Sequence, residues 1–492
     1  MIGPCLGLLK ILILVPFYFV KIRFVNEYPE PTTVKSVGLF HIPCHANGGG
    51  EKVLWAIVNK LVEEKKYNIH IYSDTIKDKD LMISKVNKFF GYSLSTKDFN
   101  LIELPEGYLT YSEHWTVFSR YLEGLSHYLV AFRALDVYMP DIFVETFTAH
   151  FSPIAVKLLN PKLKVMTYVH YPFTGPHVLE AYLNEAMDDL QGVKSRIFAA
   201  IKYVYHGGLY YLYKWMGSFS DVCFTNSSWT QKHMEANWGD KCEVLYPPCN
   251  VDEFWNQDFK TKEKVVVSLG QYRPEKRHDL QLDMMKYHLE KHPNSDIKFK
   301  ILGSGKFEES EKAFQRLQKR VKDEKIKNVE LLKDLPFDTL KNTIRSATFG
   351  VHTMIDEHFG ISIVELLSGG LVTLAHNSAG PKDDILGNGK EALYGILANN
   401  DQDFKEKFDQ MLTEYYSNPD KQKQYQQMIL RGQKFARENL SNEAFATKFV
   451  NKLKTLAADT EKEARTRVAE AKAAKAKAEA EKKKQAKKEG DL

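Results

Sequence analysis

Short runs of β-branched and aromatic residues alternate with amphipathic stretches from Ser36 onward. In EKVLWAIVNKLVEE (51–64), for example, the apolar side chains recur at helical spacing and fall on one face. The runs that predict strands in the first half are SVGLFHI (36–42), YNIHIYS (67–73), DIFVETF (141–147), KVMTYVHY (164–171) and DVCFTNS (221–227). Largely apolar strands separated by helices are typical of a parallel sheet covered on both faces.

The alternation stops at residues 244–264, a polar stretch whose Pro-Pro pair cannot continue a helix. A second series of strands then follows: VVVSLGQY (265–272), IKFKILGSG (297–305), VELLKDL (329–335), FGVHTM (349–354) and LVTLAHN (371–377). The pattern therefore predicts an α/β protein with two doubly wound, Rossmann-like domains. In such sheets ligands gather beyond the carboxyl ends of the strands, so we expect the two domains to face one another across a cleft.

The predicted domains cover residues 36–255 and 264–440, and a helix at 441–458 crosses them. Residues 459–492 are rich in Lys, Ala and Glu, with high helix propensity but no apolar stripe to bury. Such a tail is a solvated helix or a disordered segment, and contact with anionic lipid is the alternative. The aromatic and cationic stretch 195–219 is either a membrane-surface element or an internal helix pair kinked at Gly207-Gly208.

Residues 1–25 are predominantly apolar, and Lys21 and Arg23 follow the apolar run. A membrane-spanning helix needs about 20 apolar residues, and flanking basic residues favour the cytosolic side. We therefore predict a single N-terminal membrane anchor with the folded body in the cytosol, with a buried or interfacial helix as the alternative.

The 492 residues carry a formal net charge of only +5, so overall charge does not suggest a nucleic-acid-binding protein. The five cysteines form no CxxC pair, and their odd number argues against a disulfide framework. We therefore expect reduced thiols in cytosolic surroundings.

Glycines, a histidine and cations occupy the predicted strand ends. Gly49 and Gly50 open the helix after the first strand, where backbone N–H groups can meet an anion. His170 ends a later strand of the same domain. Arg273 and Lys276 follow the first strand of the second domain and suit a diphosphate. For each, a purely structural turn is the alternative, and the spacing of His41, Cys44 and His45 does not support zinc.

DEHFGISIVELLSGG (356–370) predicts a loop that leaves a strand, followed by a short helix. Glu357 then lies in the loop and Glu365 inside the helix. If all the residues between were helical, the two would be about 12 Å apart along the axis. They are therefore expected to hold different parts of one long ligand rather than share a proton or a metal ion.

The chain resembles the GT-B glycosyltransferases of retaining family 4, and among them the eukaryotic GDP-mannose-dependent α-1,2-mannosyltransferases of the dolichol-linked oligosaccharide pathway. The resemblance covers about residues 40–445. It rests on HANGGGEKVLW, YVHYPF, NSSWT, LYPPCNVDEF, GQYRPEKRH, EHFGISIVE and HNSAGPKDDI. Where many relatives have arginine after the strand's glycine, this chain has Gln271.

The resemblance implies roles for individual residues. His170, Lys276 and Glu357 would be catalytic: His170 would touch the transferred sugar, Lys276 would neutralise the leaving diphosphate, and Glu357 would face the donor mannose. The other donor contacts would come from Gly49, Gly50, Arg273, Phe359, Gly360, Ile361 and Glu365, the last holding the ribose hydroxyls. Retention by same-face attack, with the leaving phosphate taking the acceptor's proton, would need no obligatory metal ion or other cofactor.

The resemblance also implies the partners. These would be GDP-mannose as donor, a dolichol-diphosphate-linked oligosaccharide (Man3GlcNAc2) that receives its fourth and fifth mannoses, the endoplasmic reticulum membrane with the catalytic domains on its cytosolic face, and other mannosyltransferases of the pathway. Nucleic acid would not be a partner. Two alternatives stay open at this point: another family 4 transferase with a different nucleotide sugar or acceptor, and an inactive GT-B relative that serves as an interaction subunit.

Overall fold

The computed structural model describes residues 31–46, 48–116, 118–147, 151–187, 193–305 and 308–490, which form two compact units. Unit 1 contains the chain up to Phe224, Met234–Cys242 and Thr447 onward, and unit 2 contains Thr225–His233 and Glu243–Ala446. The predicted membrane anchor at 1–25 lies outside the described residues. Within the described residues, no helix is long and apolar enough to span a bilayer.

The sheet of unit 1 has seven strands in the order β3-β2-β1-β4-β5-β6-β7. Their bounds are β1 Ser36–Phe40, β2 Asn68–Ser73, β3 Asn100–Glu103, β4 Ile142–Glu145, β5 Lys164–Val169, β6 Val222–Thr225 and β7 Cys242–Val244. β1 is parallel to both β2 and β4, its neighbours in the sheet. The direction of winding reverses between β1 and β4, and a doubly wound sheet binds ligands at this switch point.

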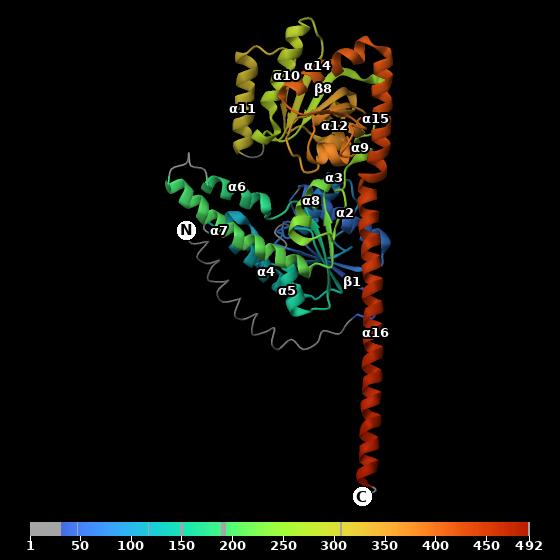
Figure 1. The fold of residues 1–492 in the computed structure, drawn as a ribbon. Coiled ribbons are helices and arrows are strands. Elements are labelled where there is room, and N and C mark those ends of the chain that lie inside the picture. Colours follow the sequence, from blue (N-terminus) through green and yellow to red (C-terminus); the bar gives the residue numbers. More distant parts are fainter. Residues whose placement is uncertain are drawn as a thin grey trace. The chain divides into compact units, whose positions relative to one another are not determined.

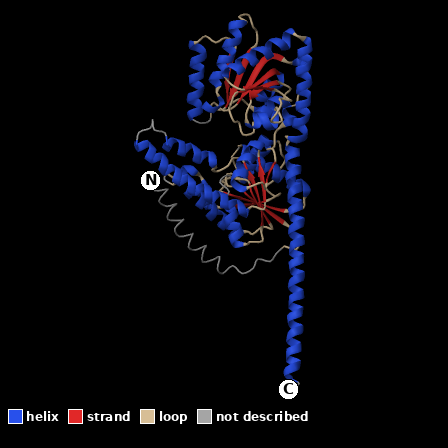
Figure 2. Ribbon diagram, viewed as in Figure 1, coloured by secondary structure: helices blue, strands red, loops and turns tan. Residues whose placement is uncertain are grey.

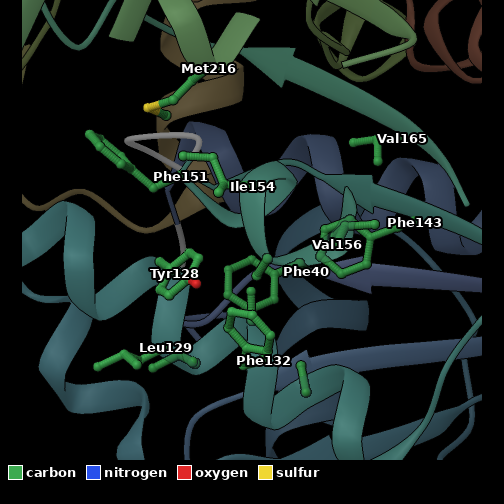
Figure 3. Close-up of a cluster of buried hydrophobic side chains, with 14 of the residues drawn as sticks. Phe40, Tyr128, Leu129, Phe132, Phe143, Phe151, Ile154, Val156, Val165 and Met216 are labelled. Atoms are coloured by element: carbon green, nitrogen blue, oxygen red, sulfur yellow. The ribbon is translucent and has the colours of Figure 1, made fainter. Parts of the chain in front are cut away.

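Helices cover the strands of unit 1 (Figures 1 and 2). They are α2 Gly49–Glu64, α3 Lys79–Phe90, α4 Ser119–Val137, α5 Ser152–Leu159, α6 Pro176–Met187 and α7 Val193–Met216, together with the end of α8 Ser228–Trp238, whose residues up to His233 belong to unit 2. Phe132 of α4 packs in one buried cluster with Phe40 of β1 and Phe143 of β4 (Figure 3). Burying each such ring contributes about 1.5–3 kcal/mol, so this cluster holds α4 on the central strands and fixes the switch point.

The sheet of unit 2 repeats this arrangement with six strands in the order β10-β9-β8-β11-β12-β13, all parallel. Their bounds are β8 Glu263–Leu269, β9 Lys298–Gly303, β10 Val329–Lys333, β11 Ala347–His352, β12 Val372–His376 and β13 Ile396–Ala398. The helices assigned after β7 are α9 Val251–Phe254, α10 His278–Lys291, α11 Glu308–Asp323, α12 Phe337–Ser346, α13 Ile361–Ser368, α14 Asp401–Ser417, α15 Pro419–Asn439 and α16 Asn442–Gly490. The switch point of this sheet lies between β8 and β11.

The prediction of two doubly wound parallel sheets is confirmed, and every strand proposed from the sequence is present. Three strands were missed: β3, β7 and β13, of four, three and three residues. Each lies at an edge of its sheet and is too short to produce a recognisable apolar period. That the two units face one another across a cleft stays a prediction.

Two segments with alternative interpretations are helical. α7 runs as one helix through Gly207 and Gly208, so the segment is not divided into two helices at the glycine pair. α16 joins the predicted crossing helix and the charged tail into one helix. Its residues from Thr447 onward belong to unit 1, where Lys454 pairs with Glu64 and Glu461 accepts a hydrogen bond from the Val34 N–H. Residues 468–481 are exposed.

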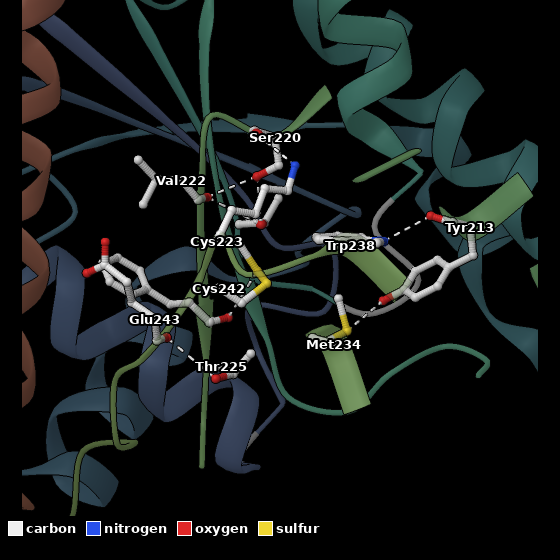
Figure 4. Close-up of a disulfide and its surroundings, with 12 residues drawn as sticks. Tyr213, Ser220, Val222, Cys223, Thr225, Met234, Trp238, Cys242 and Glu243 are labelled. Carbon is white, nitrogen blue, oxygen red and sulfur yellow. Dashed lines mark hydrogen bonds between the residues drawn. A yellow bond between two sulfur atoms is a disulfide. The ribbon is translucent and has the colours of Figure 1, made fainter. Parts of the chain in front are cut away.

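Cys223 of β6 and Cys242 of β7 form a disulfide, with their Cα atoms 4.6 Å apart (Figure 4). The expectation that the cysteines are reduced is therefore wrong for this pair. The odd cysteine count and the absence of CxxC spacing carry no information about which strands are neighbours, and β7 itself was missed. Cys44 and Cys249 are buried and form no disulfide; the Cys249 thiol donates to the Pro247 carbonyl at 3.5 Å.

A close backbone approach at the end of β9 generates a stability prediction. A Cβ added at Gly303 would lie 2.5 Å from the Gly270 carbonyl oxygen and 2.6 Å from the Tyr272 ring. Because backbone cannot move aside cheaply, we expect Gly303→Ala to lower the free energy of unfolding by about 1–3 kcal/mol. The matched control is Gly207→Ala in α7, where an added Cβ meets nothing within 4 Å and a change of at most about 1 kcal/mol in the stabilising direction is expected. Equal losses in both variants, measured by denaturant titration, would contradict this interpretation.

Candidate active site

The carboxyl ends of β8 and β11 bring a lysine, a glutamate and a histidine of unit 2 into contact. The Lys276 ammonium lies 2.5 Å from Glu357 Oε2, and His352 Nε2 lies 3.0 Å from the same oxygen. β8 and β11 flank the switch point of the sheet, so these three side chains occupy the place where a doubly wound sheet binds its ligand.

Local hydrogen bonds fix the turn that carries Lys276. A short 3₁₀ turn at Pro274–Lys276 follows β8 and leads directly into α10. The Thr353 hydroxyl, just after β11, donates to the Lys276 carbonyl at 2.6 Å, and the Gln281 amide donates to the same hydroxyl at 2.9 Å. Thr353 and Gln281 are buried, so solvent does not compete for these bonds. The turn is thereby bound to the strand that supplies His352.

The electrostatics of the cluster keep Glu357 ionised. Burial alone would raise the pKa of Glu357, but the hydrogen bond and charge of His352 and the ammonium of Lys276 outweigh it and lower the pKa to about 2. Burial also lowers the pKa of His352, although Glu357 acts in the opposite direction. A neutral His352 with its proton on Nε2 donates to Glu357 and accepts from the Ser362 hydroxyl, 3.4 Å from Nδ1.

The loop between β11 and α13 exposes a helix N-terminus beside this cluster. Gly360 precedes α13 with φ +112°, a conformation that favours glycine, and no side chain caps the helix. Phe359 is buried against Tyr246, with ring centroids 5.6 Å apart, and the Gly380 N–H donates to the Glu357 carbonyl at 3.0 Å. The first N–H groups of α13 and the Lys276 ammonium are therefore the donors that this switch point offers to an anion.

The other predicted donor contacts of unit 2 are placed less centrally. Arg273 is 44% exposed and lies 3.9 Å from Glu275, whereas its neighbour Arg277 pairs with Asp401. Glu365 is half-buried within α13, and Ile361 is half-buried at the start of that helix. The prediction that Glu357 lies in the loop and Glu365 in the helix is confirmed. Their contacts to donor stay predictions.

Unit 1 has a second polar cluster at its own switch point. His41, just after β1, lies 2.9 Å from the Thr146 hydroxyl through Nδ1 and 3.4 Å from Glu51 through Nε2. His170, just after β5, donates from Nε2 to the Thr146 carbonyl at 3.0 Å. A Cβ on Gly50 would lie within 4 Å of both imidazole rings, so the start of α2 borders the two histidines.

The protonation of His170 follows from its surroundings. Burial lowers the pKa of His170 to about 4, and the nearby His41 contributes in the same direction. The ring is therefore neutral near pH 7, and because Nε2 carries the proton, Nδ1 presents a lone pair that can accept a hydrogen bond from a sugar hydroxyl.

Glu51 also accepts the Gly48 N–H at 2.8 Å, which closes the first turn of α2, the helix that Gly49 and Gly50 open.

The sequence interpretation missed His352, Glu51 and Thr146. His352 was visible as the last residue of a predicted strand, a position where functional groups gather in this architecture. Glu51 was visible as the third residue of the helix that follows Gly48. From this position a glutamate side chain can accept a hydrogen bond from the backbone N–H of the residue that caps the helix. The three residues considered as zinc ligands have separate partners: Glu51 and Thr146 for His41, Met82 for Cys44, and Asp74 for His45.

Two family descriptions match the chain. The one described as ALG11 mannosyltransferase N-terminus matches residues 34–238, and the one described as glycosyl transferases group 1 matches residues 251–435. Together they contain both polar clusters, so the two switch-point sites belong to the part of the chain that defines the family.

Individual proteins are similar over nearly the same length. A Xenopus laevis protein named GDP-Man:Man(3)GlcNAc(2)-PP-Dol alpha-1,2-mannosyltransferase is 32% identical, covering 84% of this chain and 87% of that protein. The Homo sapiens protein of the same name is 29% identical over 78% of this chain and 81% of its own. A Rickettsia africae glycosyltransferase structure shares the fold, with a TM-score of 0.58 at 15% identity over 85% of this chain and 97% of its own.

The fold is therefore that of the GT-B glycosyltransferases. Because relatives at this identity span most of both chains, the chain belongs to the family of GDP-Man:Man(3)GlcNAc(2)-PP-Dol α-1,2-mannosyltransferases.

Proposed function

We propose that the protein transfers mannose from GDP-mannose to Man3GlcNAc2 on dolichol diphosphate, in α-1,2 linkage with retention, and adds the fourth and fifth mannoses. The observation that carries this proposal is the 32% identity over 84% of the chain to a protein named for that donor, acceptor and linkage. The paired clusters at the switch points of both sheets supply the chemistry that such a transfer needs.

The charge that develops on the leaving group determines the role of unit 2. As the bond between the mannose anomeric carbon and the β-phosphate oxygen breaks, negative charge accumulates on GDP. The Lys276 ammonium and the uncapped N-terminus of α13 are donors already in position to stabilise that charge. Glu357, kept ionised and oriented by Lys276 and His352, faces the donor mannose and stabilises its cationic character.

The proton of the acceptor hydroxyl must also be transferred when the new bond forms. The acceptor hydroxyl attacks the anomeric carbon on the face that GDP leaves, and its proton passes to the departing phosphate oxygen, so no protein nucleophile is needed. His170 positions the transferred sugar by accepting a hydroxyl hydrogen bond at Nδ1. With a lysine and a helix N-terminus serving the diphosphate, we propose that the reaction has no obligatory divalent ion.

A transfer assay tests the assignment. The full chain is incubated with radiolabelled GDP-mannose or UDP-glucose and lipid-linked Man3GlcNAc2, and the products are sized and digested with an α-1,2-mannosidase. We expect two mannosidase-sensitive additions from GDP-mannose alone, with an initial rate that EDTA leaves unchanged. Transfer from UDP-glucose instead indicates another family 4 transferase, and no transfer at all indicates an interaction subunit. Either outcome overturns the proposal.

The contact between Lys276 and Glu357 predicts coupled kinetics. Removing one pre-placed electrostatic donor typically costs about 10²–10³-fold in rate, so we expect losses of that size in kcat/KM for GDP-mannose from Lys276→Ala. Because Lys276 and Glu357 are in contact, the Lys276→Ala, Glu357→Gln double variant should lose less than the product of the single losses. Lys264→Ala, which breaks an exposed pair with Asp296, is the control and should keep normal activity. Multiplicative losses would show that the two residues act independently.

A lipid-linked acceptor requires access to a membrane surface, and we propose that α7 provides it. An exposed apolar stripe follows one face of this helix: Val193, Ile197, Ile201, Val204, Tyr211 and Trp215. Lys194 and Lys214 are exposed on the same helix and suit anionic headgroups. The segment 1–25 would add the single-pass anchor at the endoplasmic reticulum, with the catalytic units in the cytosol, and neighbouring mannosyltransferases of the pathway would share this membrane.

Substituting the stripe tests this membrane contact. In a chain that lacks residues 1–25, Ile197→Glu combined with Ile201→Glu should reduce sedimentation with anionic vesicles at least about tenfold, since charge is costly in the apolar boundary. The rate with a water-soluble short-chain acceptor should stay the same. Leu430→Glu, an equally drastic change at an exposed site on α15, is the matched control. If sedimentation were unchanged in the double variant, α7 would not be the contact.

A further inference from the structure

Two histidines and an aspartate of unit 2 converge away from the Lys276 cluster. His288 lies in the last turn of α10, and His292 follows one turn later, directly after the helix ends. Asp409 of α14 faces both: its Oδ1 lies 2.9 Å from His288 Nδ1 and 3.2 Å from His292 Nε2. The ligand-type atoms of the three residues all lie within 4.8 Å of one another.

We propose that His288, His292 and Asp409 form a binding site for a divalent transition metal ion of the zinc type. Two imidazoles and one carboxylate are ligands that zinc and its neighbours prefer, and three protein ligands leave a fourth position for water. Bonds of 2.0–2.1 Å in a tetrahedron place ligand atoms about 3.3 Å apart. The separations of 2.9 and 3.2 Å from Asp409 Oδ1 to the two imidazole nitrogens need only a small expansion, and the two nitrogens lie within 4.8 Å of one another.

The surroundings of His288 support this role. Its side chain is 2% exposed, and its Nε2 lies 2.9 Å from the Ser295 hydroxyl oxygen. When Nε2–H donates to Ser295, Nδ1 has a free lone pair on the side of Asp409. A hydrogen bond on the outer ring nitrogen is the usual way in which a protein orients a metal-binding imidazole. His292, 42% exposed, provides the path by which an ion enters.

Lys291 is the group that competes with a metal ion. Its ammonium lies 3.2 Å from Asp409 Oδ2, whereas the histidines face Oδ1. The two carboxylate oxygens are thus divided between one cation and the two imidazoles. The alternative interpretation is an ion pair in which a protonated His292 at the end of α10 contacts Asp409 without any metal. Replacing Lys291 separates the two interpretations because only a metal site predicts tighter zinc binding once the neighbouring ammonium is removed.

A metal here would fasten α10 to α14 without taking part in the transfer. His288 is ten residues beyond the start of α10, about 15 Å along the helix axis from the turn that carries Lys276. The site therefore braces the far end of the helix whose near end positions the diphosphate ligand. This inference does not rest on the identity of the transferred sugar.

The test uses the full chain without an affinity tag, treated with a chelator and then titrated with zinc ion. Thermal unfolding should shift upward by about 2–3 °C when zinc exceeds its Kd a hundredfold. His292→Ala, a change at a partly exposed position, should remove that shift while keeping the metal-free Tm. Lys291→Gln should tighten zinc binding at least about threefold, because a positive charge near the ion is gone.

Cobalt provides a readout specific to coordination. The wild-type protein should show the visible absorption of four-coordinate cobalt(II), and Asp409→Asn should lose it. The proposal is overturned if the wild-type Tm does not respond to zinc, if His292→Ala responds equally, or if the Tm responds only to pH between 5 and 7. Loss of mannose transfer would overturn the proposed function but leave these measurements unchanged.

Discussion

The contact between the Lys276 ammonium and the Glu357 carboxylate is the interaction on which the site of unit 2 depends. It exists because β8 (Glu263–Leu269) and β11 (Ala347–His352), far apart in the sequence but adjacent in the sheet, end at the same edge. The ion pair is half-buried, so water screens it little, and His352 completes the hydrogen bonding of the carboxylate.

Both units have a switch point in their sheet, but the side chains placed there differ in charge. At the switch point of unit 2, Lys276 and Glu357 carry opposite charges, and in the proposed reaction the lysine suits the negative charge of a leaving diphosphate. At the switch point of unit 1, burial lowers the pKa of His170 and keeps its imidazole neutral, which in the proposed reaction suits a sugar hydroxyl. A family that transfers a sugar from a charged donor to an uncharged hydroxyl needs both kinds of surface.

The sequence was sufficient for much of this arrangement. The long central strands and α13 carried enough apolar periodicity to be located, and Lys276, Glu357 and His170 were found because they follow such strands. The residues that contact these side chains were harder to find. His352 and Thr146 make their contacts across neighbouring strands, and the local apolar period does not reveal which strands are neighbours. The disulfide was missed for the same reason, since Cys223 and Cys242 became neighbours only through β7, a strand of three residues.

The exposed end of α16 has a consequence for local stability. From Thr447 to Arg467 the helix belongs to unit 1, with Thr460 and Ala464 buried, but residues 468–481 are exposed. Helical turns without tertiary contacts are held by propensity alone and open with free energies close to zero. A single continuous helix therefore comprises a stable part that is packed on unit 1 and an exposed part that frays readily.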